Sequence, residues 1–130
     1  PVGEQELILI AESGFKRFPP RLTWQPIFYP VLNETYACEI ASEWNVNDIA
    51  ANYLGFVTKF DVLESYIARY EIQNVGSTIH NELWIPSNEL NSFNDAIVGS
   101  IQITQAFIGK SYKRSNSSVI ISIINQLTHG

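Results

Sequence analysis

Three side chains that could do acid–base or charge-stabilising chemistry stand at alternate positions of one short stretch, Ser77 to Pro86. Its β-forming residues and its closing proline predict a strand. Because successive side chains of a strand point to opposite faces, His80, Glu82 and Trp84 should share one face. An imidazole, a carboxylate and an indole would then lie side by side.

A second group of chemically useful residues surrounds Pro19 and Pro20. Arg17 and Arg21 flank the two prolines, and Trp24 follows them. Arginine matches the geometry of a phosphate group through paired hydrogen bonds, so these residues could form a phosphate-facing wall beside a ring-stacking side chain. The same pattern also fits a solvated basic loop that one aromatic side chain anchors, and both interpretations stay open.

A strand followed closely by a capped helix forms a third candidate site. Phe28 and Tyr29 lie in a short strand predicted between two prolines, and Asn33 is a typical N-cap for a helix from Glu34 to Trp44. Backbone N–H groups converge at such a helix start and can bind an anion.

The composition argues against several other chemistries. One cysteine, Cys38, and two histidines cannot supply the four paired ligands of a structural zinc site, so no metal is expected. Phosphate-binding glycine loops and a nucleophile elbow are absent from the sequence. The net charge of −5 argues against nucleic-acid binding, and the apolar runs are too short to span a membrane. Cys38 reads as a core thiol, and with no leader at the start of the chain we expect a cytoplasmic setting. Glycoside hydrolysis requires two facing carboxylates, and Glu71 could approach Glu82 as the second one.

Helices and strands that must position these groups alternate along the chain. Helices are predicted over Gly3 to Ser13 with Gly14 as the stop, over Val62 to Arg69 with Asp61 as the cap, and over Asn88 to Asn94 with Ser87 as the cap. Further extended segments are predicted over Tyr53 to Phe60, Glu71 to Val75 and Ile101 to Ile108. This order indicates an α+β domain. We expect core contributions from Phe56, Val57, Phe60, Leu83, Ile85, Ile101 and Ile103.

The last part of the chain has a different character. Residues 110–118 are polar and typical of a linker, and Val119 to Leu127 is apolar at a spacing that suits a helix or a strand. We therefore divide the chain into a domain at 1–109 and a linker with an apolar segment at 110–130. That segment could return onto its own domain or complete a homodimer.

Three blocks, Gly14 to Arg21, Gln25 to Asn33 and Glu82 to Pro86, resemble a small bacterial family commonly labelled ADP-ribosylation/crystallin J-like proteins. The resemblance covers roughly residues 1–108. It implies a fold like that of ADP-ribosyltransferases, in which a bent mixed or antiparallel sheet forms a split β-sandwich with short surrounding helices. Family members carry a Leu-Tyr-Arg stretch ahead of the Pro-Val-Gly that stands here at Pro1 to Gly3, so the resemblance implies an N-terminal strand that is missing or truncated.

The same resemblance implies a function and a set of site residues. The protein would bind NAD as a substrate, cleave the bond between nicotinamide and ribose, and transfer ADP-ribose to an unknown acceptor. Glu82 would face the developing positive charge, with His80 two residues before it where many transferases place Gln or Glu to orient the acceptor. The alternative is a non-catalytic interaction module, a toxin-neutralising or scaffold protein that keeps the fold. The expected NAD-binding residues are Arg17, Arg21, Trp24, Phe28, Tyr29 and Asn33.

Overall fold

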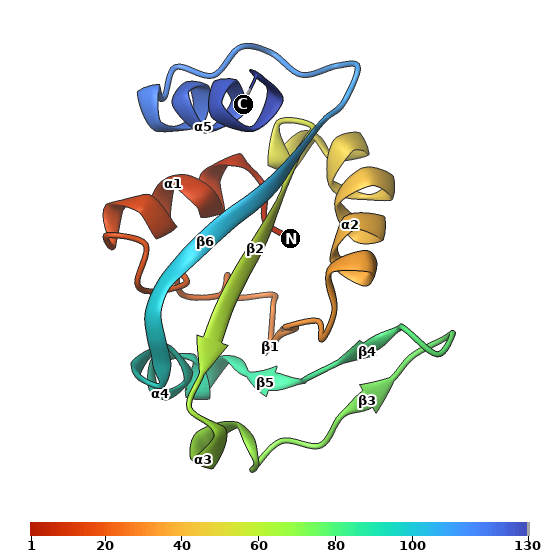
Figure 1. The fold of residues 1–130 in the computed structure, drawn as a ribbon, viewed down its shortest axis with the longest axis vertical. Helices are drawn as coiled ribbons and strands as arrows, with labels where there is room; N and C mark the ends of the chain where they lie inside the picture. The colour runs from red at the N-terminus through yellow and green to blue at the C-terminus, as the bar shows by residue number, and fades with distance from the viewer. Residues whose placement is uncertain (130) are drawn as a thin grey trace.

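A long two-stranded antiparallel ribbon runs through the centre of the structure (Figure 1). The computed structural model describes residues 1–129, and in it β2 (Leu54–Val62) pairs with β6 (Ile97–Ile108). Register shifts after Val57 and after Lys59 interrupt the ladder. Such irregularities bend a strand, and β6 curves strongly in Figure 1. Both strands were predicted, and each is longer than the sequence indicated.

Helices lie on both sides of this ribbon (Figure 1). On one side lie α1 (Glu4–Glu12) and α5 (Ser118–His129), and on the other lies α2 (Glu34–Glu43). The predicted end of α1 is confirmed, because Gly14 adopts a positive φ of 76° that glycine tolerates without strain. The predicted cap of α2 is confirmed as well, because the Asn33 side chain accepts a 2.8 Å hydrogen bond from the Tyr36 N–H.

The remaining elements are short: two 3-10 turns connect α2 to β2, and the others close the end of the molecule where β2 ends and β6 begins (Figure 1). The strands are β1 (Ile27–Phe28), β3 (Gln73–Asn74), β4 (Asn81–Glu82) and β5 (Ile85–Pro86), the helices are α3 (Glu64–Ile67) and α4 (Leu90–Asp95), and the 3-10 turns are η1 (Asn45–Asn47), η2 (Ile49–Ala51) and η3 (Ser87–Glu89). β1 pairs with β5 and β3 pairs with β4, both antiparallel. The described fold is therefore mixed α+β, as predicted.

Three local predictions were wrong. Ser87 does not cap a helix, because it is the first residue of η3, and Glu89 stands at the N-cap position of α4. Ser77 to Pro86 is not one strand, because β4 pairs with β3 whereas β5 pairs with β1, and the chain changes partner between them. Simple alternation consequently fails there, and Glu82 and Leu83 are both buried. Asp61 does not cap a helix, because β2 continues through it and α3 has Leu63 at its N-cap position.

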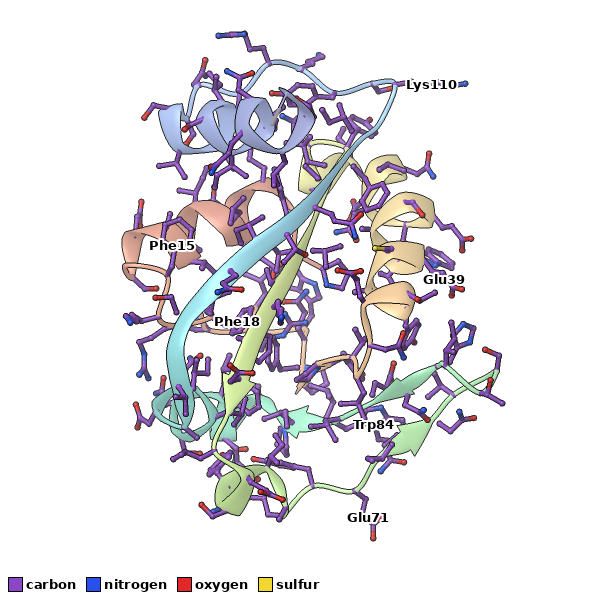
Figure 2. All side chains as sticks on the ribbon, in the orientation of Figure 1. Phe15, Phe18, Glu39, Glu71, Trp84 and Lys110 are labelled. Carbon is purple, nitrogen blue, oxygen red and sulfur yellow. The ribbon has the colours of Figure 1, made fainter. Side chains whose placement is uncertain are left out.

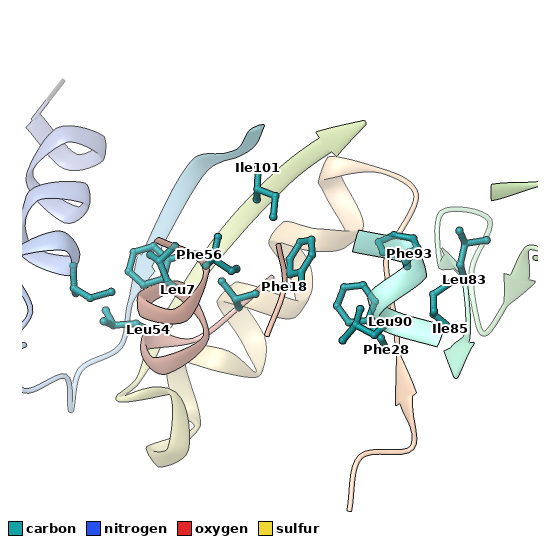
Figure 3. Close-up of a cluster of buried hydrophobic side chains, with 13 residues drawn as sticks. Leu7, Phe18, Phe28, Leu54, Phe56, Leu83, Ile85, Leu90, Phe93 and Ile101 are labelled. Carbon is teal, nitrogen blue, oxygen red and sulfur yellow. The ribbon is translucent and has the colours of Figure 1, made fainter. Parts of the chain in front are cut away.

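Aromatic side chains join the two ends of the molecule in one hydrophobic core (Figure 3). Phe18 packs on Phe28 with ring centroids 5.0 Å apart, and Phe28 packs on Phe93 at 5.5 Å. Tilted and edge-to-face aromatic pairs stabilise a core by about 0.5–1.5 kcal/mol beyond the area they bury. Of the predicted core residues, Phe60 and Ile103 are partly buried, and the others are buried: Phe56, Val57, Leu83, Ile85 and Ile101.

The C-terminal segment contributes to this same core. Ile120 of α5 is completely buried, and Ile123 and Ile124 pack against the cluster. The apolar face of α5 is thus covered by its own chain. No helix within residues 1–129 combines the length and the apolar character needed to cross a membrane.

Candidate functional site

Glu82 lies at the point where the small strands meet α2. β4 places Glu82 between β3 on one side and Val31 on the other, and Glu82 is only 9 % exposed. The Tyr36 hydroxyl donates a 2.8 Å hydrogen bond to Oε2 of Glu82, and Nε1 of Trp84 donates one of 2.8 Å to Oε1. Both carboxylate oxygens are therefore fixed in position by aromatic side chains.

The donors that hold Glu82 are neutral, and among residues 1–129 its carboxylate has no ion-pair partner. Within the described part of the chain, no Lys, Arg or His nitrogen lies within 4.0 Å of this carboxylate, whereas Asp95, Glu6 and Glu39 each have such a partner. Burying a carboxylate without a counter-ion is unfavourable, so carboxylates that serve only the fold are usually paired. The arrangement leaves a negative charge available to a cationic group that enters from outside.

His80 belongs to the same cluster but faces the other way. Its Nε2 lies 2.8 Å from Oε2 of Glu39, and its Nδ1 accepts a hydrogen bond from the Ser77 N–H at 3.2 Å. The second bond requires Nδ1 to be unprotonated, so Nε2 carries the proton that is donated to Glu39. The ring also packs on Tyr36, with centroids 4.7 Å apart. Glu39 lies on the outer side of α2 in Figure 2, so His80 contacts Tyr36 from that side.

A cavity of about 460 Å³ opens beside Glu82, and we call it the Arg21 cavity. Arg21 and Glu6 supply its other charged side chains, with Nη1 of Arg21 3.8 Å from Oε2 of Glu6. Nε of Arg21 donates to the Ile27 carbonyl at 3.2 Å, and the guanidinium lies 5.7 Å from the centre of the Phe28 ring. Burial raises the pKa of Glu6, and attraction to Arg21 offsets part of that effect. The volume of the Arg21 cavity falls within the range of typical small-molecule sites.

A second cavity, of about 480 Å³, adjoins the first, and we call it the β2 cavity. It lies between β2, the start of α2 and the segment Pro30 to Leu32. The two cavities share five lining residues: Pro30, Val31, Ala37, Thr58 and Phe60. They therefore form neighbouring parts of one cleft.

Some of the predicted site residues come together in this cleft. Arg21, Phe28, Tyr29 and Glu82 all line the Arg21 cavity, and Asn33 lines the β2 cavity. The Asn33 side chain is already engaged, because it caps α2 and donates to the Ile79 carbonyl at 2.7 Å.

Others lie elsewhere. Arg17 pairs with Asp95 of α4 at 2.7 Å and donates to the Asn91 carbonyl, away from both cavities. Trp24 is 74 % exposed and lines neither cavity. Arg17 and Arg21 therefore do not form a common phosphate wall, because the intervening prolines carry them to different elements.

Tyr36 and Glu6 were missed by the sequence analysis. Tyr36 stands among the apolar residues of α2, one turn after the Asn33 cap where an anion site was expected. Burial, followed by its hydrogen bond to Glu82, raises the pKa of Tyr36 to about 12. Glu6 stands in the acidic first turn of α1, and nothing in that pattern distinguishes it from Glu4.

Two other reactive residue types give no further site. Burial raises the pKa of the Cys38 thiol, which opposes the formation of a nucleophilic thiolate. Within the residues described, no three His, Cys, Asp or Glu side chains cluster closely enough to hold a metal ion.

Comparison of the chain with protein-family models, with curated proteins and with solved structures gives no match.

Proposed function

We propose that the cleft binds NAD and that Glu82 promotes cleavage of the bond between nicotinamide and ribose, as an ADP-ribosyltransferase-like protein would. The observation that carries this proposal is the Glu82 carboxylate, which is nearly buried, held by two neutral donors and open to a cavity. Such a carboxylate is suited to a ligand that gains positive charge as it reacts.

The Arg21 cavity offers complementary groups for the rest of the substrate. The Arg21 guanidinium can pair with a phosphate, because its Nη1 is 3.8 Å from Glu6 and a closer anion can displace that weak contact. Tyr29 is half exposed at the same cavity and can stack on a base. Arg21 and Glu82 thus supply one positive and one negative contact within a single cleft.

Cleavage would break the bond between C1′ of the ribose and N1 of nicotinamide, with the bonding electrons leaving on nicotinamide. The sugar then carries the positive charge of an oxocarbenium ion, as in glycoside hydrolysis. Glu82 faces that charge, and Tyr36 and Trp84 prevent the carboxylate from turning away. An acceptor nucleophile gives an electron pair to C1′ and releases its proton to water, which completes the transfer.

His80 has a supporting role in this proposal. Both of its ring nitrogens are engaged, with Glu39 and with Ser77, so it is not free to take a proton from an acceptor. It packs on Tyr36, which in turn holds Glu82. His80 is therefore a positioning residue.

The test compares nicotinamide release from NAD by the wild-type protein, Glu82→Gln and Glu71→Gln. Glu71 is the matched control, because it is exposed, lines neither cavity and points away from the molecule in Figure 2. We expect Glu82→Gln to slow release about a hundredfold, equivalent to about 2.7 kcal/mol at the transition state, and Glu71→Gln to leave the rate unchanged.

Calorimetry separates binding from chemistry in the same variants. Glu82→Gln should still bind NAD, because Arg21 and Tyr29 are intact. If the wild-type protein shows neither nicotinamide release nor heat of binding at millimolar NAD, the proposal is wrong and the interaction-module alternative takes its place.

A further inference from the structure

The charged side chains are unevenly distributed along the chain. All 13 acidic residues lie at or before Asp95, together with five of the eight lysines and arginines, so residues 1–95 carry a net charge of −8 and residues 96–130 one of +3. The three remaining cations, Lys110, Lys113 and Arg114, stand within five positions of the loop that connects β6 to α5. We call residues 109–117 the basic loop. A charge asymmetry of this kind is typical of a chain that meets an anionic partner.

Hydrogen bonds to the body of the molecule hold the basic loop in place, although its composition is typical of a linker. The Asn52 side chain donates to the Lys113 carbonyl at 2.8 Å and accepts from the Lys113 N–H at 3.4 Å. The Gly109 N–H donates to the Tyr53 carbonyl at 2.8 Å, and Tyr112 packs against the hydrophobic core. A loop that is already ordered loses little conformational entropy when a partner binds to it.

The cationic side chains of the basic loop are free to meet a partner. Lys110, Lys113 and Arg114 are all exposed, and Figure 2 shows Lys110 pointing outward beyond the end of β6. Within residues 1–129, no carboxylate oxygen lies within 4.0 Å of any of the three. Like charges in one short loop repel one another, and a bound anion would remove that repulsion.

We infer that the basic loop binds a short acidic segment of another protein, whose Asp and Glu side chains pair with Lys110, Lys113 and Arg114. Arg114 can hold a carboxylate through two parallel hydrogen bonds, and the two lysines act as point charges. The loop lies at the opposite end of the molecule from β4, which carries Glu82 (Figure 1). The inference therefore goes beyond the proposed function and holds whether or not the cleft binds NAD.

Acidic side chains beside the basic loop favour a short ligand over a long polyanion. The Asn52 side chain that holds Lys113 also donates to Oε1 of Glu4 at 3.2 Å, so a carboxylate lies next to the loop. Asp48, whose carbonyl accepts from the Tyr53 N–H, is exposed on the adjoining turn. A nucleic-acid backbone or a membrane surface extends past the loop and would meet these carboxylates. A five-residue segment spans at most about 17 Å and can stay on the loop.

Titration of the full chain with acetyl-Asp-Glu-Asp-Glu-Asp-amide, followed by NMR at low salt and without NAD, tests the site. We expect the amide signals of the basic loop to shift while those of residues 80–84 stay unchanged, and we expect binding to weaken as salt is added. The uncharged control peptide acetyl-Asn-Gln-Asn-Gln-Asn-amide should cause no shift. If the acidic peptide causes no shift in the loop at millimolar concentration, the inference is wrong.

Variants with matched charge changes locate the binding. Lys113→Gln with Arg114→Gln should weaken binding of the acidic peptide about tenfold. Lys16→Gln with Arg69→Gln removes two exposed cations that also lack an ion pair within residues 1–129, and it should leave binding unchanged. Asn52→Gly keeps every charge of the loop and suits the positive φ of 50°, but it removes the side chain that holds Lys113, so binding should weaken about threefold. Equal effects of the two double variants, or unchanged binding by Asn52→Gly, would overturn the inference.

Two other polyanions test the class of partner under the same conditions. They are an oligothymidylate of about ten nucleotides and vesicles that contain about one-third phosphatidylserine. We expect both to bind more weakly than the acidic peptide, because they extend over Glu4 and Asp48. Tighter binding of either one would assign the basic loop to nucleic acid or to a membrane surface and would contradict the inference.

Discussion

Tyr36→Phe is the substitution that tests most directly how Glu82 is held. It removes one oxygen atom, the donor of the 2.8 Å bond to Oε2 of Glu82, and leaves an aromatic ring that can still pack on His80. The carboxylate keeps its bond from Trp84 but has one donor fewer in a site from which water is largely excluded. We therefore expect the variant to be folded and less stable.

The structure sets the size of the effect. A hydrogen bond to a charged group contributes about 1.5–3 kcal/mol, whereas one between neutral groups contributes about 1 kcal/mol. Glu82→Gln by itself should change the free energy of unfolding little or raise it, because it removes a buried charge that lacks a counter-ion. Tyr36→Phe should consequently destabilise the wild-type background by about 2 kcal/mol and the Glu82→Gln background by about 1 kcal/mol.

Urea unfolding of the four proteins in this double-mutant cycle measures the difference. The slope of free energy against urea concentration should stay constant, so that midpoints report stability alone. A coupling energy near 1 kcal/mol exceeds the scatter expected of independent sites. If Tyr36→Phe destabilises both backgrounds equally, or if Glu82→Gln is the most destabilising change, the argument that Glu82 carries an uncompensated charge fails.

Three further predictions concern Tyr36, the docking of α5, and the contact between β2 and α2. In an ultraviolet titration, Tyr36 should ionise at a higher pH than an exposed tyrosine, because burial and a hydrogen bond to a carboxylate raise its pKa from 10.0 to about 12. Between pH 10 and 12 the folded state keeps a proton that the unfolded state loses, so the free energy of unfolding should fall as the pH rises. The fall should be smaller in Tyr36→Phe, which lacks this ionising group. Ile120→Ala should destabilise the protein by about 2–5 kcal/mol in urea, since Ile120 is fully buried in the core, whereas Val119→Ala at the partly exposed neighbouring position should have a much smaller effect; equal effects would mean that α5 is not docked. Gly55→Ala should destabilise by about 1–3 kcal/mol, because the new Cβ would lie 2.8 Å from the Ala41 carbonyl oxygen where β2 meets α2, and an unchanged midpoint would contradict that packing.

Local sequence patterns were sufficient where a single element determines the outcome. The Asn33 cap, the glycine that ends α1 and the two long strands all follow from neighbouring residues, because capping and alternation act within a few positions. Closeness in sequence also brought Glu82 and Trp84 together, although alternation does not continue from β4 into β5. They do meet, because they are two residues apart.

Contacts between distant segments were decided only by the tertiary structure. Tyr36 and Glu82 are 46 residues apart and meet because Val31 bridges to Glu82, which brings the start of α2 over β4. Pairing of β4 with β3 and of β5 with β1 split the predicted strand and buried both Glu82 and Leu83.

The two arginines of the proline segment show the same division. The sequence places Arg17 and Arg21 four residues apart, but packing sends one to Asp95 of α4 and the other to Glu6 of α1. Residue types and local spacing thus determined which groups are available. Sheet register and helix docking determined which of them share a cleft, because long-range packing sets the direction in which each side chain points.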